Sequence, residues 1–237
     1  MPENPQPIRP LGQPCIPAEP YSEDRPGVPD VVDADLDLYG AEAAGARVAE
    51  QLQSNEPNHV RHTDDGRALL WPPFAPARDH VDGYASATTT LVVFGAFGTP
   101  WSHRLGAVLA RVRADHHMSA RIAWRHYPDP VAHPRAAALA LASEVAAVHG
   151  RFWVLTRRLL SMSHDDPADV HRALLRASLD PERVLGEVQA GTGTERIAED
   201  VASARASGVT SAPALFIDGE RYTGELGPTA VSRALDR

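Results

Sequence analysis

The sequence contains no lysine, so all 23 of its basic residues are arginines. Its single cysteine, Cys15, excludes an intramolecular disulfide. No run of about 18 apolar residues occurs, so no segment is predicted to cross a membrane as a helix. Met1 to Pro20 has no apolar signal core, and this predicts a cytoplasmic location.

An excess of positive charge is also missing, because the net charge is −8. Nucleic acid and anionic membrane surfaces need a basic face, so neither is predicted as a main partner. The hydrophobic content of 43% and the charged content of 23% are typical of a soluble globular protein. The 237 residues can form one well-filled domain with extensions.

The most informative stretch joins an apolar β-branched run, Thr88 to Phe94, to an amphipathic helix that contains Leu105 and Val112. Thr99 is predicted to cap this helix, and Pro100 fits its first position. The turn from Thr99 to Ser102 is therefore expected at a helix N-terminus, with free N–H groups and a positive dipole end.

This stretch resembles the active-site region of DsbA-like members of the thioredoxin superfamily. There a strand ends in aromatic-Gly-x-Phe and is followed by C-P-x-C and a helix, whereas this chain has Thr-Pro-Trp-Ser at residues 99–102. Later motifs resemble the family in the same order, namely Arg125–Pro128 with His133-Pro134, then Gly208–Pro213, then Ala214–Gly224. Residues 76–83 resemble a bacterial subgroup that also occurs fused to Na+/H+ antiporters.

The resemblance implies an α/β thioredoxin-like fold with a DsbA-type helical insertion at about 134–207. Residues 88–237 are then the domain, 31–87 an N-terminal extension with one helix over 41–53, and the Pro-rich segment 1–30 a disordered tail.

Local signals predict further elements. A strand is expected over 121–127, parallel to the first strand, and a β-hairpin over 214–223 with a turn at Asp218-Gly219. The expected helices cover 136–149, 151–162, 194–207 and two segments opened by Asp166-Pro167 and Asp180-Pro181; another begins at Pro228.

The chemistry of the 99–102 turn follows from its lack of sulfur. Neither Thr99 nor Ser102 can form a disulfide, and a helix dipole cannot turn an aliphatic hydroxyl into an alkoxide. Thiol–disulfide exchange by this motif is excluded. Thr99 either serves only as a helix cap or, with the free N–H groups, holds an anion or a thiolate brought by a cofactor.

A ligand groove is predicted between this turn and the loop around Pro213. In the family the matching proline is cis, and its neighbour pairs with bound peptide or thiol backbone. Pro213 serves either the fold alone or binding as well. The candidate ligand-binding residues are Thr99, Pro100, Trp101, Ser102, His103, Ala212 and Pro213, and Thr99 and Ser102 are also the only catalytic candidates.

No metal site is predicted, because the histidines show no spacing that supplies three or four convergent ligands. His116 and His117 are adjacent and point in different directions on a helix, while His126 and His133 flank a loop. No resident cofactor is predicted, although a low-molecular-weight thiol is an option.

Three hypotheses follow for the function. The first is a redox-inactive DsbA-like domain that binds a peptide, partner or small ligand in the residual groove. The second is a thiol-dependent transferase or isomerase, since kappa-class glutathione transferases carry a Ser-Pro-x-Ser-like sequence at this turn. The third is a regulatory companion of a membrane ion transporter, from family association.

Overall fold

The computed structural model describes residues 46–47, 50, 60–162 and 166–236. Cys15 and the tail predicted over 1–30 lie outside the described residues, as does most of the extension. Of the helix predicted over 41–53, only Ala46, Arg47 and Glu50 are described, and they are helical.

A mixed five-stranded sheet lies at the centre of the described chain, with strand order β1-β3-β2-β4-β5. The two longest strands, β2 (Thr89–Gly95) and β3 (Ala120–His126), pair in parallel and are joined through α2 (Ser102–His116). The other neighbours pair antiparallel, which places β4 (Ala214–Ile217) beside β2. Strand β3 begins and ends one residue before the predicted 121–127, and β4 begins at the predicted Ala214.

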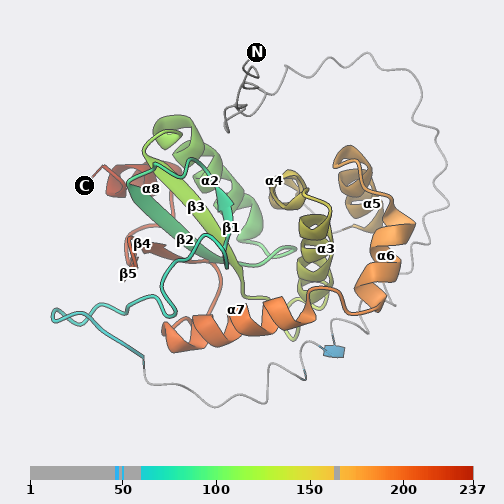
Figure 1. Ribbon diagram of the computed structural model, residues 1–237, viewed down its shortest axis with the longest axis horizontal. Coiled ribbons are helices and arrows are strands. Elements are labelled where there is room, and N and C mark those ends of the chain that lie inside the picture. The colour runs from blue at the N-terminus through green and yellow to red at the C-terminus, as the bar shows by residue number, and fades with distance from the viewer. Residues whose placement is uncertain (1–45, 48–49, 51–59, 163–165, 237) are drawn as a thin grey trace, which may run out of the picture. The chain divides into compact units, whose positions relative to one another are not determined.

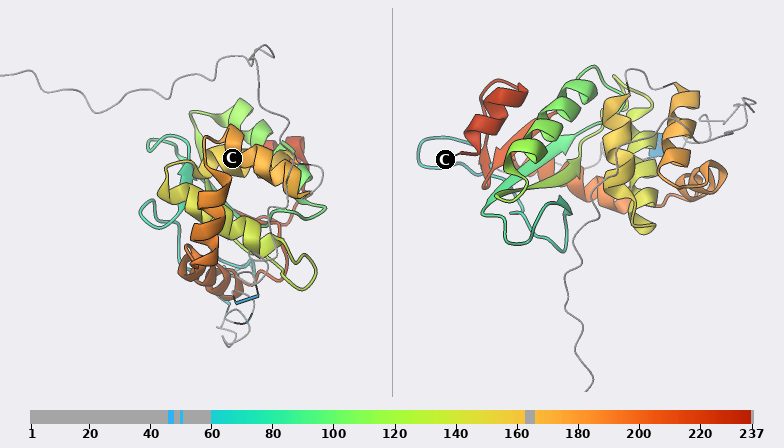
Figure 2. Two further views of the ribbon diagram at one scale, coloured as in Figure 1. Left: turned by 90° about the vertical axis from the view of Figure 1, so that its right-hand side faces the viewer. Right: turned by 90° about the horizontal axis from the view of Figure 1, so that it is seen from above.

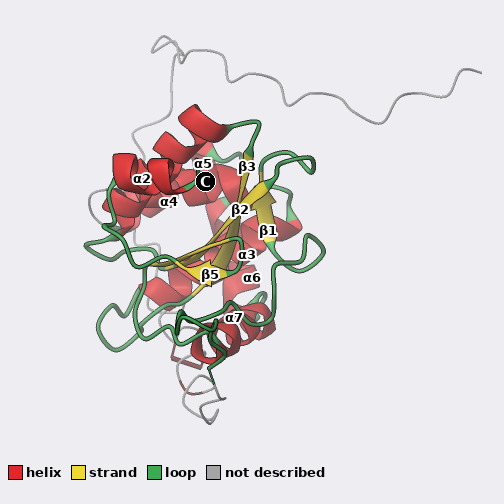
Figure 3. Cartoon of the chain, turned by 90° about the vertical axis from the view of Figure 1, so that its left-hand side faces the viewer, coloured by secondary structure: helices red, strands yellow, loops and turns green. Residues whose placement is uncertain are grey.

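Each face of the sheet is covered by helices (Figure 1, Figure 3). Helix α2 packs against α8 (Pro228–Ala234) over one face, and α7 (Thr194–Ala206) crosses the other and contacts β3. The side chains of strand β2 alternate between the two faces. Leu91 and Val93 belong to the hydrophobic core on the side of α2, and Val92 and Phe94 belong to the core on the side of α7. This alternation is what a strand buried on both faces produces.

The predicted helical insertion follows β3 and gathers at one end of the sheet (Figure 2). It contains α3 (Ala136–Val148), α4 (Phe152–Ser161), α5 (Pro167–Arg176) and α6 (Pro181–Gln189). Asp166 and Asp180 cap α5 and α6 by accepting hydrogen bonds from the N–H groups of Ala168 and Glu182. The Asp-Pro signals therefore identify both helix starts correctly.

Two short strands complete the sheet. The hairpin from β4 to β5 (Glu220–Arg221) turns at Asp218 and Gly219, which have φ angles of 50° and 89°. Positive φ at both positions is type I′ geometry, and the turn lies at the two residues predicted for it. Strand β1 (His80–Asp82) pairs with β3 and was not predicted, because three residues at a sheet edge carry too little periodic pattern.

No helix of the described segments is long and apolar enough to cross a membrane.

Candidate functional site

The turn between β2 and α2 is closed by the hydroxyl of Ser102. This hydroxyl donates to the carbonyl of Ala96 at 3.0 Å, accepts from the Thr99 N–H at 3.0 Å and lies 3.0 Å from the Thr99 hydroxyl. Ser102 is thereby buried, with 3% of its surface exposed, and its hydroxyl is fully engaged. The Thr99 side chain is half-buried.

The predicted cap is wrong in detail. The N-cap residue of α2 is Trp101, which makes no side-chain cap hydrogen bond, and the helix begins at Ser102 rather than at Pro100. The Ser102 N–H bonds instead to the Thr99 carbonyl at 3.0 Å, which makes a tight turn before the helix. The Thr99 hydroxyl faces the Ser102 hydroxyl and leaves the helix N–H groups uncapped.

A cavity of about 380 Å³ lies beside this turn. Its wall includes Thr99 and Trp101 from the turn and Thr210 to Ala212 from the loop before β4. The Ala212–Pro213 peptide bond in that loop is cis. The remaining lining residues come from the start of the turn, the exit of β3 and helix α7: Ala96, Tyr127, Pro128, Asp129, Pro130, Val131, His133, Val201 and Arg205.

The sequence-predicted site residues divide between this cavity and other places. Thr99, Trp101 and Ala212 line it. Ser102 lies behind Thr99. His103 points elsewhere, because it lines a separate apolar cavity of about 310 Å³ between α2 and α4. Pro100 is exposed and Pro213 half-buried, and neither is among the lining residues.

The cavity combines apolar and polar surface. Trp101 is 49% exposed and Val131 83% exposed, so both offer apolar contact area. Burial raises the pKa of the Tyr127 phenol above its usual value, so Tyr127 stays neutral and keeps an O–H donor at neutral pH. Asp129 accepts from the N–H groups of Val131 and Ala132, at 3.1 and 3.0 Å, and thereby shapes the outer wall.

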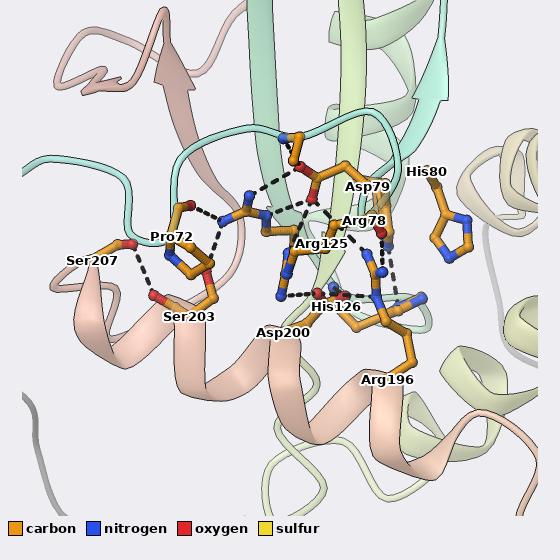
Figure 4. A network of polar contacts seen from close by, with 12 residues as sticks. Pro72, Arg78, Asp79, His80, Arg125, His126, Arg196, Asp200, Ser203 and Ser207 are labelled. Carbon is orange, nitrogen blue, oxygen red and sulfur yellow. Dashed lines mark hydrogen bonds and ion pairs between the residues drawn. The ribbon is translucent and has the colours of Figure 1, made fainter.

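A buried arginine connects three chain segments, namely its own strand β3, residues 72–79 and helix α7 (Figure 4). Arg125 of β3 has no exposed surface, and all five of its guanidinium N–H groups donate hydrogen bonds. Two go to the Asp79 carboxylate at 2.7 and 3.0 Å. The others reach the carbonyls of Pro72 and Pro73 and the hydroxyl of Ser203, at 2.8, 3.2 and 2.8 Å.

Helix α7 shares this network. Asp200 accepts from the His126 backbone N–H at 2.9 Å and from Arg78 at 3.0 Å. Ser203 donates to the Trp71 carbonyl, and the Ser207 hydroxyl accepts from the Trp71 N–H, each at 2.8 Å. The polar network therefore attaches residues 71–79, which precede the predicted domain, to the sheet and to α7.

A second buried cluster adjoins the first. Glu144 of α3 accepts hydrogen bonds on the same oxygen, Oε1, from Nε2 of His80 and Nε2 of His126, each at 2.8 Å. Burial raises the pKa of Glu144, but the two imidazole hydrogen bonds outweigh it and hold the pKa well below its usual range. Gly193 makes room for this side chain, because a Cβ at position 193 would lie 2.3 Å from the Glu144 Cβ.

Sequence reasoning missed both buried clusters. One signal was available, since Arg125-His126 directly follows the apolar residues 122–124 of a central strand and charged residues are almost never fully buried unless paired. The partners could not be chosen, because Asp79, Glu144 and Ser203 are far apart along the chain.

The chain is similar in sequence to a known family and to several named proteins. Residues 77–237 match the family model described as thioredoxin. A protein named Na(+)/H(+) antiporter NhaA 1, from Mycolicibacterium gilvum, is 35% identical over 193 residues, which are 80% of this chain and 30% of that protein. Another, Na(+)/H(+) antiporter NhaA 3 from Salinispora tropica, is 36% identical over 174 residues, 72% of this chain and 26% of that protein. The chain thus spans about 30% or less of the length of these relatives.

Solved structures are similar at lower identity. BdbD from Bacillus subtilis has a TM-score of 0.60 at 14% identity, covering 71% of this chain and 96% of that one. A thioredoxin-like oxidoreductase from Silicibacter pomeroyi has a TM-score of 0.59 at 21% identity, with coverages of 69% and 92%. These likenesses concern the arrangement of helices and strands alone.

Proposed function

The chain belongs to the thioredoxin family, and on that premise we propose that it is a redox-inactive binding domain whose cavity beside Thr99 accepts an extended peptide segment. The predicted fold class is confirmed, since the chain has a DsbA-like thioredoxin fold. The observation that carries the proposal is the cavity of about 380 Å³ between the 99–102 turn and the loop that ends in the cis Ala212–Pro213 bond.

The proposed redox inactivity is inferred from the cysteine content and from the residues at positions 99 and 102. The only cysteine is Cys15, and positions 99 and 102 carry hydroxyls. Thiol–disulfide exchange needs a thiolate attacking a disulfide sulfur, and a hydroxyl at either position cannot supply one.

Peptide binding is supported by the backbone beside the cavity. Within the described chain, no backbone hydrogen bond uses the N–H or the carbonyl of Ser211 or Ala212. Such unpaired groups can pair with an extended segment, as when a strand is added to a sheet edge. Trp101 and Val131 would then contact the side chains of that segment, because both line the cavity and are exposed.

The test is a selection of short unstructured peptides from a displayed library, followed by affinity measurement on purified variants. We expect Trp101→Ala to weaken the selected peptides by about 30-fold or more, since truncating an aromatic anchor costs about 2 kcal/mol or more. Leu175→Ala is the matched control, because Leu175 is an exposed apolar residue of α5 outside the cavity. Equal affinity of all three proteins would contradict the proposal.

To test the thiol-dependent alternative, glutathione is titrated into the purified wild-type and variant proteins. Of the two hydroxyls in the turn, only that of Thr99 belongs to a cavity-lining residue, since Ser102 is buried and engaged. Saturable binding of glutathione that is lost in Thr99→Val, without peptide binding, would favour the thiol-dependent transferase or isomerase instead.

We also propose that the domain acts beside a membrane ion transporter. The support is that relatives at 35% and 36% identity are named Na(+)/H(+) antiporters and are more than three times as long as the matched part. The expected partner is an antiporter of that family from the same cell.

Vesicles that contain this antiporter, with and without the chain, provide the measurement. We expect the chain to change the rate or the Na+ dependence of exchange, and Trp101→Ala to reduce the effect while Leu175→Ala keeps it. Identical exchange with and without the chain at saturating concentration would refute the association.

A further inference from the structure

We propose that His80, His126 and Glu144 form a binding site for one divalent transition-metal ion of the zinc type. Among the described residues, the two imidazole nitrogens and one carboxylate oxygen all lie within 4.8 Å of one another. The proposal uses residues outside the cavity beside Thr99 and does not depend on the proposed function.

The donor set selects the class of ion. Two imidazole nitrogens and one carboxylate are ligands that zinc and its neighbours prefer, whereas Ca²⁺ and Mg²⁺ prefer oxygen ligands throughout. The same set with an open fourth position is a known arrangement for zinc. Water or a small ligand could reach that position past His80, whose side chain is 19% exposed.

The geometry is close to what an ion needs. Metal–ligand bonds of about 2.0–2.1 Å in a tetrahedral site place neighbouring ligand atoms roughly 3.3–3.4 Å apart. Glu144 Oε1 now lies 2.8 Å from each Nε2, and the three ligand atoms all lie within 4.8 Å of one another, so small side-chain adjustments bring them to these separations.

The imidazole rings are held in orientation by aromatic neighbours. His80 stacks on Phe152, with ring centroids 3.7 Å apart and an interplanar angle of 15°. His126 meets the edges or faces of Phe97, Trp124 and Phe152 at centroid distances of 5.9 to 6.0 Å. Ligands fixed in this way lose little side-chain freedom when an ion binds.

Charge also favours a cation here. Glu144 is 6% exposed and its carboxylate is ionised at neutral pH, yet its described partners are two imidazoles rather than a guanidinium. A divalent ion would compensate the buried carboxylate directly.

The bound state has a distinctive proton arrangement. His126 Nδ1 now accepts from the Trp124 indole N–H at 3.1 Å, so its ring proton is on Nε2, facing Glu144. When Nε2 binds the ion, this proton moves to Nδ1, and Trp124 loses its acceptor. Binding therefore changes the tautomer of a specific ring, which can be observed.

The first measurement titrates the chelator-treated full-length protein with Co²⁺ and follows the visible absorption of a tetrahedral complex, with Zn²⁺ added to displace it. We expect one equivalent to bind. His80→Ala and Glu144→Gln should lose this band, while His149→Ala should keep it. His149 is a matched control because its Nε2 lies 3.2 Å from Glu187 without a second imidazole.

The second measurement uses the wild-type chain and does not depend on any variant remaining folded. Nitrogen-15 spectra of the imidazole rings are expected to show His126 changing from the Nε2–H to the Nδ1–H form when one equivalent of Zn²⁺ is added. An unchanged tautomer would overturn the proposal, as would a Co²⁺ band that survives in folded His80→Ala and Glu144→Gln.

Discussion

Replacement of Arg125 by methionine is expected to lower the free energy of unfolding by about 3–5 kcal/mol, as is typical when one partner of a buried ion pair is removed. Asp79 is fully enclosed and receives two hydrogen bonds from the Arg125 guanidinium. Without that group, the Asp79 carboxylate and the carbonyls of Pro72 and Pro73 lose buried donors. The same change therefore also loosens the segment that precedes β1.

The measurement is equilibrium denaturation of both proteins, supported by thermal melting. A loss of this size corresponds to a decrease in Tm of roughly 6–20 °C for a domain of this length. Arg67→Met is the matched control, because Arg67 pairs with Asp65 and Glu220 while 41% of its side chain is exposed. An exposed pair contributes about 1 kcal/mol or less. Equal losses in the two variants would disprove a special role for Arg125.

The loss of stability in Arg125→Met should also depend on pH in a defined direction. Burial raises the pKa of Asp79, but the hydrogen bonds and charge of Arg125 outweigh it and keep the pKa below its usual value. In the wild type this contribution to stability is therefore present above about pH 3.9 and is lost as the pH falls through the folded-state pKa. In Arg125→Met the pKa of Asp79 rises instead, so the stability difference between the two proteins should narrow at acidic pH.

A double variant separates the lost charge pair from lost packing. Asp79→Leu combined with Arg125→Met removes both charges, and we expect it to recover part of the stability that Arg125→Met alone loses. If the double variant is less stable than Arg125→Met, the Asp79 carboxylate, left with Arg78 and the Ala75 N–H as its partners, is not the main cost.

The elements that sequence predicts well are those with local signals. The β-branched run before Phe94 and the spacing of Leu105 and Val112 identify a strand and a helix from neighbouring residues alone. Asp166 and Asp180 identify helix starts because a cap bonds to an N–H only two residues away. Each of these signals lies within one element and needs no tertiary partner.

The features that sequence missed depend on tertiary contacts. Arg125 is satisfied by residues about 50 positions before it and 78 positions after it, which no local pattern relates. The predicted cap at Thr99 fails because the Thr99 hydroxyl pairs with the Ser102 hydroxyl, which itself donates to the Ala96 carbonyl. The order of the motifs therefore predicts which turn and which loop form the candidate site. The buried hydrogen bonds around Arg125 are known only from the structure.

The second large effect is expected at the 99–102 turn, where Thr99→Cys with Ser102→Cys should create thiol–disulfide chemistry that the wild type lacks. The two hydroxyl oxygens already lie 3.0 Å apart. Cysteine side chains in these positions should come within disulfide reach after a small adjustment, since disulfide geometry needs Cβ atoms about 3.5–4.5 Å apart. The positions also differ usefully in exposure, with residue 99 half-buried and residue 102 buried.

Electrostatics should favour a thiolate at position 99. It lies just before the start of α2, where the helix dipole and uncapped N–H groups stabilise negative charge. The cavity wall formed by Ser211 and Ala212 then provides a place for a substrate backbone. Catalysis is expected to be weak, because Ala96 and Gly98 stand where a carboxylate could assist proton transfer.

The measurement uses a Cys15→Ser background, so that no other thiol contributes. Wild-type protein in this background should show no turnover in an insulin-reduction assay, whereas the double-cysteine variant should show some. The alkylation rate of Thr99→Cys against pH should give an apparent pKa below the unperturbed value of about 8.5. The matched control is Thr88→Cys, because Thr88 is exposed, precedes β2 and lies away from any helix N-terminus. The thiol of this variant should titrate near that unperturbed value.

Two results together would contradict this interpretation of the turn. One is an apparent pKa at position 99 equal to that of the control thiol, and the other is failure of the double variant to form a disulfide under mild oxidation. The first would mean that the N-terminus of α2 does not stabilise charge at position 99, and the second that the observed approach of the two side chains does not occur in solution. If instead the pKa is lowered and the disulfide forms, the absence of sulfur at positions 99 and 102 is sufficient to explain the redox inactivity proposed for the wild-type chain.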